Sequence, residues 1–237
     1  MPDPGPGVVL ITRPQPAATE TARLVAALGF VPLVAPVLQT TLCPARLPAP
    51  DRVQALLLTS ANAVPVLSAE FHHLPVFAVG HATAAAARAA GFARVTSAAG
   101  TAADLASLVA RLCDPDRGSL LFPGAARIAV DIAKPLREVG FRVIRRVVYR
   151  TDPMAELAVP ARAALAVGGV RVALFFSPAS AQAFGALLRA ALPPTSVTTV
   201  EAIAISAKVA ACLAPLPWRR IRVASLPNQD EMVALLT

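Results

Sequence analysis

The stretch LLLTSANA, residues 56–63, decides the fold, because a close copy of it lies in the second half of the chain. The copy is ALFFSPASA, residues 173–181. In both copies a short apolar segment runs into a small hydroxyl residue and then into an Ala-rich segment with helical periodicity. This pattern is typical of a buried parallel strand that enters a helix. The chain is therefore predicted to contain one α/β unit twice.

The repeat extends beyond these two stretches. The pattern of residues 8–28 predicts a strand followed by a helix that ends at Gly29. A second strand that ends at Phe122 is likewise followed by a helix, over residues 126–139, that ends at Gly140. An extended segment follows each helix, at residues 30–41 and 141–150. Prolines in the first of these segments exclude the middle of a sheet and indicate an edge or connecting strand.

The remaining elements follow from apolar runs, caps and breakers. Further strands are expected at residues 53–59, 75–79, 94–97, 172–176, 202–205 and 221–224. Further helices are expected at residues 60–70, 84–90, 105–112, 161–167 and 229–236, and one more begins at Ser177. Thr101 and Asp104 have the spacing of a capping box before residue 105. Strands alternate with helices, which indicates an α/β fold with parallel sheets.

Composition excludes several classes of protein. The 237 residues are 56% hydrophobic and only 15% charged, which excludes a disordered chain and is enough for two domains with filled cores. No apolar run reaches the length that spans a bilayer, and residues 1–7 carry no basic leader segment, so we expect a soluble, cytoplasmic protein without membrane association. The three cysteines are widely spaced without a CxxC pair, and we interpret them as reduced, mostly buried thiols.

The formal charge of +8 suggests acidic partners, but the arginines are scattered. Local groups occur at Arg142, Arg145, Arg146 and Arg150, and at Arg219, Arg220 and Arg222. No aromatic residues alternate with them, as a nucleic-acid surface would require, and we favour solvated strand faces and ends over binding of nucleic acid.

Small and hydroxyl residues recur at six strand exits. Parallel sheets bind ligands at the carboxyl ends of their strands, where helix N-termini present free amides to anions. The candidate binding residues at these exits are Thr12, Arg13, Ser60, Ala61, Asn62, Gly80, His81, Thr83, Gly124, Arg127, Ser177, Pro178, Ser180, Ser206 and Lys208. Any one Ser or Thr among them could be an ordinary helix cap, but their recurrence favours a site built from backbone N–H groups.

Other kinds of site lack their sequence motifs. The chain has no GxGxxG, GxxxxGK[ST], GxSxG or HExxH motif, which argues against dinucleotide, P-loop, hydrolase and zinc-peptidase sites. The histidines His72, His73 and His81 lack the spacing of metal ligands, and we interpret them as surface or loop residues. We therefore expect neither a metal nor a cofactor.

The order and spacing of the strand exits resemble the uroporphyrinogen-III synthase family over nearly the whole chain. The segments that carry the resemblance are Thr12-Arg13-Pro14, Thr59-Ser60-Ala61-Asn62-Ala63, Val79-Gly80-His81-Ala82-Thr83-Ala84, Phe122-Pro123-Gly124, Val148-Tyr149-Arg150-Thr151 and Phe176-Ser177-Pro178. Each one by itself is only a strand exit, so the specificity lies in the set.

The resemblance implies two related parallel-sheet α/β domains joined by a two-stranded antiparallel ladder, with the first βα unit packing with the C-terminal half. One domain would comprise residues 1–35 and 155–237, and the other residues 42–145. The linker would comprise residues 36–41 and 146–154. Residues 31–38 and 143–149 would form the ladder, and the active cleft would lie between the domains.

The family's reaction is cofactor-free closure of a linear hydroxymethyl tetrapyrrole, with loss of water and inversion of the last ring. The resemblance therefore implies a monomeric enzyme of tetrapyrrole biosynthesis whose partner is this small molecule. Backbone amides and Arg side chains would hold the substrate's carboxylates. Tyr149, the only tyrosine, would assist departure of the hydroxyl group as a catalytic residue; by sequence alone it is a partly buried aromatic on a strand.

The chain departs from the family's pattern at one exit. The family usually has Gly-x-Thr-Thr where this chain has Ser206-Ala207-Lys208-Val209, and Ala179 stands where a second Ser is common. The changes put carboxylate contacts there in question, although Lys208 could supply a cation. They leave open an alternative function, a non-catalytic module of the same fold that binds a tetrapyrrole or another acidic ligand.

Overall fold

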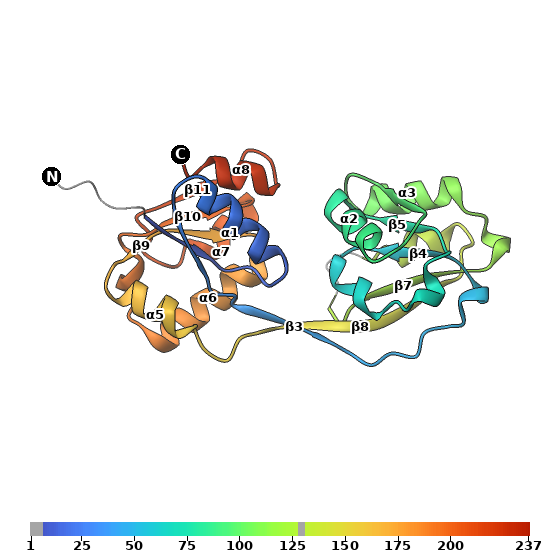
Figure 1. The fold of residues 1–237 in the computed structure, drawn as a ribbon, viewed down its shortest axis with the longest axis horizontal. Helices are drawn as coiled ribbons and strands as arrows, with labels where there is room; N and C mark the ends of the chain where they lie inside the picture. Colours follow the sequence, from blue (N-terminus) through green and yellow to red (C-terminus); the bar gives the residue numbers. More distant parts are fainter. Residues whose placement is uncertain (1–6, 128–130) are drawn as a thin grey trace. The chain divides into compact units, whose positions relative to one another are not determined.

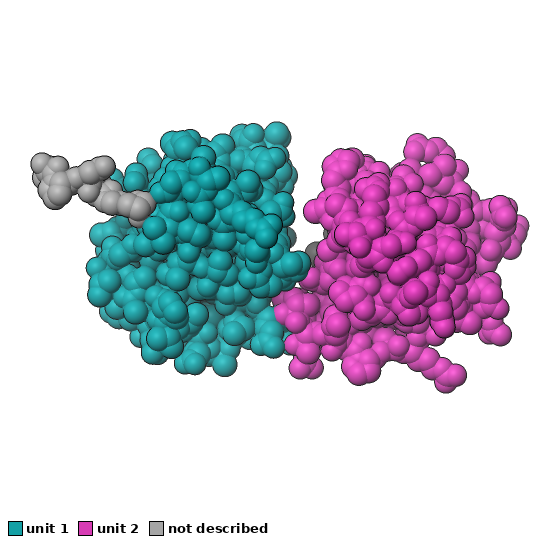
Figure 2. All heavy atoms as spheres, in the orientation of Figure 1, with its two compact units in different colours: residues 1–39, 152–237 teal, residues 40–151 magenta. Residues whose placement is uncertain are grey.

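The computed structural model describes residues 7–127 and 131–237. The chain divides into two compact units, unit 1 with residues Met1–Gln39 and Asp152–Thr237 and unit 2 with residues Thr40–Thr151 (Figure 2). Each unit has a sheet whose strands are mostly parallel, with helices on both faces (Figure 1). The predicted α/β class is confirmed.

The sheet of unit 1 has the strand order β11-β10-β9-β1-β2, and its neighbouring strands are parallel. Its strands are β1 (Val8–Ile11), β2 (Val31–Val34), β9 (Val170–Phe175), β10 (Glu201–Ala204) and β11 (Arg220–Val223). In register, Leu10 of β1 lies opposite Ala173 of β9. The first βα unit therefore packs with the C-terminal half, as predicted.

Alternation of side chains along the strands of unit 1 sorts its helices into two layers. The helices are α1 (Ala17–Ala27), α5 (Val159–Ala166), α6 (Pro178–Ala191), α7 (Ala207–Leu213) and α8 (Gln229–Ala234), with the 3-10 turn η5 (Pro194–Val197). Leu10 belongs to the core that α5, α6 and α7 cover, whereas its neighbours Val9 and Ile11 belong to the core under α1 and α8. Successive strand residues point to opposite faces, so one strand supplies both cores.

The sheet of unit 2 has the order β3-β8-β7-β4-β5-β6. Its strands are β3 (Leu38–Leu42), β4 (Val53–Leu58), β5 (Val76–Ala78), β6 (Val95–Ser97), β7 (Ser119–Ala125) and β8 (Val143–Pro153). The 3-10 helix η2 (Ala61–Val66) and α2 (His81–Ala89) share one core, and α3 (Ala102–Leu112) and α4 (Ala133–Glu138) share the other. Short 3-10 turns are η1 (Pro50–Arg52), η3 (Ala69–Phe71) and η4 (Pro115–Arg117).

The chain passes between the units in two neighbouring strands, β3 and β8. Cys43 N–H donates to the Val148 carbonyl oxygen at 2.8 Å, and Met154 N–H donates to the Val37 carbonyl oxygen at 3.0 Å. Residue numbers rise along one segment as they fall along the other, so the pair is antiparallel.

The extent predicted for the first ladder strand is wrong. Residues 31–38 are not one strand, because β2 pairs in parallel with β1 in unit 1 and only β3 reaches β8. Pro36 separates the two strands and has no N–H to donate. Pro32 is tolerated in β2 because this strand lies at the edge of its sheet.

Two predicted helices also differ. Residues 60–70 form the 3-10 segments η2 and η3 rather than one α-helix, since Pro65 interrupts the backbone ladder. The helix expected at residues 126–139 begins only at Ala133, because β7 continues through Pro123 and Gly124 to Ala125. The continuation is stabilised by pairing with β8, where Gly124 lies opposite Val147. Residues 128–130 lie outside the described part of the chain.

The cysteines are free thiols, but Cys43, Cys113 and Cys212 are half-buried rather than mostly buried. Within residues 7–127 and 131–237, no helix is long and apolar enough to cross a membrane.

The predicted capping box of α3 is confirmed and generates a pH-dependent stability. The Asp104 carboxylate accepts from the Thr101 backbone N–H at 2.6 Å and from its hydroxyl at 2.8 Å, and these bonds lower the pKa of Asp104 below its ordinary value of 3.8. Because the pKa of this carboxyl is lower in the folded state than in the unfolded state, its ionised form stabilises the folded protein. The full stabilisation is present at pH values above the pKa of the unfolded state. It is lost as the pH falls through the pKa of the folded state. Asp104→Asn is therefore expected to destabilise unit 2 at pH 7 and to match the wild type much more closely at about pH 3.

Urea unfolding followed by circular dichroism at the two pH values measures this difference. Asp51→Asn removes an exposed carboxylate elsewhere in unit 2 and serves as the control. An equal loss of stability from Asp104→Asn at both pH values would contradict the assignment.

Candidate functional site

The carboxyl ends of the central strands of unit 2 meet at one edge. Leu58 at the end of β4 lies opposite Ala78 at the end of β5, and β7 runs parallel to β4 on its other side. Ala125 at the end of β7 lies opposite Tyr149 of β8. The exits at Ser60 and Gly80 therefore share an edge with Tyr149.

The β4 exit presents the N-terminus of η2. Ser60 is extended, with φ of −156°, and its hydroxyl oxygen accepts from Asn62 N–H at 3.2 Å. Ser60, Ala61 and Asn62 are all half-buried. The Ser60 side chain thus acts as a cap, and the other amides of the first turn remain the anion-binding element of this exit.

The β5 exit presents the N-terminus of α2. Gly80 is the N-cap, and a Cβ placed on it would meet no atom within 4 Å, so a ligand could approach the backbone closely. His81 is exposed. Thr83 is only 7% exposed and lies on the buried face of α2 beside Ala84, and we assign it to helix packing rather than to ligand binding.

Tyr149 lies in a hydrophobic core. Its side chain is 6% exposed and belongs to the cluster that includes Leu58 and Ala63, and its carbonyl oxygen accepts from Ala126 N–H at 2.8 Å. Within the part of the chain that the structure describes, the phenol hydroxyl forms no hydrogen bond. The ring of Tyr149 therefore contributes to packing whether or not the residue takes part in catalysis. Only its hydroxyl group could have a catalytic role.

Sequence reasoning missed the importance of Arg145. This half-buried side chain donates from its guanidinium to the Ala125 carbonyl oxygen at 2.6 Å, which fixes the end of β7 beside Tyr149. Its buried Nε has no hydrogen-bond partner among the described residues. In the sequence it stood out only as one of the group Arg142, Arg145, Arg146 and Arg150, four residues before Tyr149 in the same extended segment.

The exit predicted at Gly124 lies one step later. Gly124 is buried inside β7, where a Cβ would lie 3.2 Å from the Phe122 ring, and the strand ends at Ala125. Arg127 is exposed. Gly124 therefore serves close packing rather than ligand binding.

In unit 1, Thr12 is a structural residue. It is 0% exposed, and its hydroxyl donates to the Leu174 carbonyl oxygen at 2.7 Å, across from β1 to β9. It has no exposed surface for a ligand, so we assign its side chain to the joining of these strands.

Arg13 is held at the carboxyl edge of the unit 1 sheet. Its guanidinium donates to the Gln229 side-chain oxygen at 2.7 Å and to the Thr21 hydroxyl at 3.2 Å, and it lies 4.2 Å from the centroid of the Phe176 ring. Burial lowers the pKa of Arg13, and Glu20 opposes this shift. Gln229 and Phe176 were not predicted as site residues, because they come from segments distant from Arg13 in the sequence.

The β9 exit is a tightly bonded cap. Ser177 accepts from Ser180 N–H at 3.1 Å, the two hydroxyls lie 2.9 Å apart, and Pro178 occupies the first turn. Ser180 is buried. Ser177 and the amides of the first turn of α6 are thus the groups of this exit that face the carboxyl edge.

The β10 exit explains the departure from the family's pattern. Ser206 is the N-cap of α7 but makes no capping bond with its side chain, and Lys208 is exposed. Val209 is 0% exposed in the core of unit 1, as Thr83 is buried in unit 2. A hydroxyl at this position points into packing, so its loss removes little ligand-facing surface.

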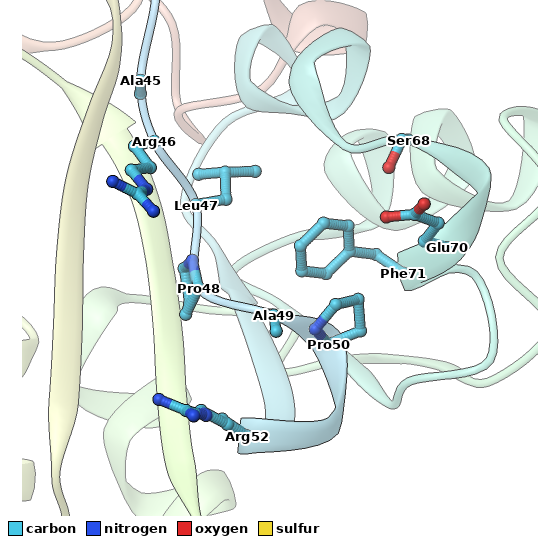
Figure 3. Close-up of a pocket in the computed structure, with 10 residues that line it drawn as sticks. All are labelled: Ala45, Arg46, Leu47, Pro48, Ala49, Pro50, Arg52, Ser68, Glu70 and Phe71. Carbon is cyan, nitrogen blue, oxygen red and sulfur yellow. The ribbon is translucent and has the colours of Figure 1, made fainter.

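One cavity of unit 2 lies away from the strand exits. A cavity of about 640 Å³ is lined by residues 45–50, Arg52, Ser68, Glu70 and Phe71 (Figure 3). These residues lie beside the amino end of β4, and none of them is a predicted site residue. Within the described ranges, no group of three or more His, Cys, Asp or Glu could hold a metal ion.

The family model described as Uroporphyrinogen-III synthase HemD matches residues 19–234. The chain belongs to the uroporphyrinogen-III synthase family. This membership supports its assignment as an enzyme of that family. In the comparison with curated proteins, no sequence matches the chain.

Two solved structures have the same fold as this member of the uroporphyrinogen-III synthase family. The uroporphyrinogen-III synthetase from Helicobacter pylori 26695 is 19% identical, with a TM-score of 0.65, and the match covers 98% of each chain. A mutant uroporphyrinogen III synthase from the extremely thermophilic bacterium Thermus thermophilus is 20% identical, with a TM-score of 0.51 and 97% of each chain covered.

Because we assign Thr12 a structural role, we expect its replacement to lower the stability of the fold without weakening substrate binding. Thr12→Val leaves the Leu174 carbonyl oxygen without this donor and is expected to cost about 1–3 kcal/mol of unfolding free energy. Thr12→Ser keeps the hydroxyl and is the control. Denaturant unfolding measures the first effect. A KM that rises for Thr12→Val in the folded protein would show that Thr12 contacts substrate after all.

Proposed function

We propose that the chain is a uroporphyrinogen-III synthase that closes a linear hydroxymethyl tetrapyrrole without a cofactor, with loss of water and inversion of the last ring. Family membership over residues 19–234 supports the reaction. The observation that carries the proposal at the site is the common edge in unit 2, which joins the exits at Ser60 and Gly80 to Tyr149. We further propose that the enzyme acts as a monomer and that this small molecule is its only required partner.

Binding of the substrate's carboxylates falls to groups that favour anions. In unit 2 these are the first-turn amides after Ser60 and Gly80, with His81 exposed beside them. In unit 1 they are the α6 and α7 N-termini and the Arg13 guanidinium. Amides at helix N-termini and a fixed guanidinium both bind carboxylates by charge-assisted hydrogen bonds.

Arg13 is preorganised for this role. Gln229, Thr21 and the Phe176 ring hold its guanidinium in place before any ligand arrives, so less side-chain entropy is lost on binding. Burial also weakens solvent screening of its charge. A substrate carboxylate at this edge would therefore gain more from Arg13 than from an exposed arginine.

The chemical step requires little from the protein. The bond between the hydroxymethyl carbon and its oxygen breaks, and the oxygen leaves as water after gaining a proton. The last ring attacks the electron-deficient carbon with the ring atom that already carries its bridge to the third ring, which gives a spiro intermediate. The bond to that bridge then breaks, the bridge carbon bonds to the free position of the last ring, and this position loses its proton. The macrocycle is thereby closed with the last ring inverted. Tyr149 can donate a hydrogen bond to the departing oxygen, and help of this kind contributes about a hundredfold to ten-thousandfold.

Orientation of the substrate supplies the rest of the rate acceleration. A flexible linear chain must be held so that its two ends meet, and fixing such a geometry can contribute several kcal/mol. The amides in the first turns of these helices belong to packed elements, so they are held in position before the substrate binds. This explains how a site without a metal motif or a strong acid and base can support the reaction.

Tyr149→Phe tests the hydroxyl separately from the ring. The ring should keep its place in the core, and turnover should fall by roughly tenfold or more, about 1.4 kcal/mol, with little change in melting temperature. Tyr149→Leu is the matched variant that removes the ring, and it should lower the melting temperature as well. An unaltered rate and product from Tyr149→Phe would leave Tyr149 a packing residue only.

The proposed reaction itself is tested with purified protein and enzymatically generated hydroxymethylbilane. Separation of the type I and type III products by chromatography should show the type III isomer as the main product. Type I alone, the product of spontaneous closure, would favour a non-catalytic binding module. The buried position of Val209 already weakens the observation that suggested that alternative.

A further inference from the structure

A second cavity in unit 2 has a marked positive charge. It has a volume of about 850 Å³ and is lined by three arginines, Arg94, Arg111 and Arg117, together with His73 and a single carboxylate, Asp114. Several lining residues lie at the starts of four neighbouring strands, and Arg111, Leu112 and Cys113 lie at the end of α3. Gln54 is the second residue of β4, while Pro75, Arg94 and Arg117 come shortly before β5, β6 and β7.

This cavity is separate from the site described above. The strand exits with Tyr149 lie at the carboxyl ends of the parallel strands, whereas this cavity lies at their amino ends, at the opposite edge of the same sheet. None of the residues predicted to bind substrate lines it. The proposed reaction therefore does not account for its charge.

The arginines come from three segments with no common local cause. Arg94 follows α2, Arg111 lies in the last turn of α3, and Arg117 ends η4. A basic residue in the last turn of a helix complements the helix dipole, which explains Arg111 alone. Among the described residues, none of these three guanidinium groups forms an ion pair or a hydrogen bond. The N–H donors of these guanidinium groups are free to bind a ligand. An anionic ligand would also reduce the electrostatic repulsion among the three positive charges.

The rim of the cavity is fixed. The Gln54 side-chain amide donates to the Asp114 carbonyl oxygen at 2.9 Å and to the Gly118 carbonyl oxygen at 2.7 Å, which holds the segment that carries Arg117. The Asp114 carboxylate accepts from Asp116 N–H at 3.0 Å, so it is already engaged in the turn. The cavity thus presents more free positive than negative groups on a preformed frame.

We propose that this amino-edge cavity binds a small polyanion that carries at least two phosphate or carboxylate groups. Guanidinium groups bind both kinds of oxyanion through paired N–H donors. Apolar side chains, Leu74, Phe77 and Leu112, also line the cavity, so a ligand with an uncharged body as well as its acidic groups fits the lining.

Cys113 provides a readout that belongs to this cavity. The thiol is one of its lining residues, and burial raises its pKa. A bound anion would shield the thiol and further disfavour the thiolate. In a full-length Cys43→Ser/Cys212→Ser variant, Cys113 is the remaining cysteine, so its labelling rate at alkaline pH reports on this position.

The test uses inorganic tripolyphosphate and citrate as probes. Either one, at low ionic strength, is expected to slow the labelling of Cys113 severalfold and to give saturable heat by calorimetry, with an effect that weakens as salt is added. A stronger effect of tripolyphosphate assigns the site to phosphorylated ligands, and a stronger effect of citrate assigns it to polycarboxylates. Protection by neither probe would overturn the proposal, as would heat of binding without protection of Cys113.

Matched arginine variants locate the binding. Arg94→Ala, Arg111→Ala and Arg117→Ala should each weaken the protection by about tenfold, whereas Arg23→Ala, which removes an exposed arginine of α1 in unit 1, should leave it unchanged. Circular dichroism checks that each variant is folded, and Arg111→Gln replaces Arg111→Ala if the helix end is disturbed. An equal loss in Arg23→Ala would show that only the net charge matters, which contradicts a defined site.

Discussion

The pairing of β1 with β9 is the contact on which the rest of the structure depends. It joins residues 8–11 to residues 170–174 in the middle of a parallel sheet, so unit 1 forms only when the N-terminal segment meets the segment that follows residue 152. Val9, Leu10 and Ile11 are each fully buried, and burial of such a side chain contributes about 1.5–3 kcal/mol. The Thr12 hydroxyl adds a side-chain bond across the same strands. Unit 2 is formed entirely by the residues between them.

Parallel pairing also explains where the proposed chemistry lies. Neighbouring parallel strands place all their carboxyl ends at one edge, and each end there is followed by a turn with free amides. The chain repeats this arrangement in both units, with extended caps at Ser60 and Ser177 of nearly equal φ, −156° and −159°. The duplication thus preserved the backbone geometry of the exits while their side chains diverged.

The divergence follows packing rather than ligand contact. Thr83 and Val209 occupy equivalent buried positions, so either a threonine or a valine satisfies the site. Ser60 accepts from a residue two positions on, in a 3-10 turn, whereas Ser177 accepts from a residue three positions on, in an α-helix. Pro65 causes this difference, because it prevents an α-helix from continuing after Ser60.

The sequence by itself determined the α/β class, the duplication, the capping box at Thr101 and Asp104 and the positions of most strand exits, because these follow from periodicity and capping over short distances. Only the tertiary structure decided which partner each segment finds. Pairing with β8 extended β7 past Pro123, and pairing with β1 took β2 away from the ladder. Three contacts join residues from different strands and helices, and no local sequence pattern predicts them. They are the packing of Tyr149 in its core, the hydrogen bond from Arg145 to Ala125 and the hydrogen bond from Arg13 to Gln229. The three arginines of the amino-edge cavity are likewise scattered in sequence. The parallel register of β4, β5, β6 and β7 brings Arg94 and Arg117 to one edge, and the end of α3 adds Arg111.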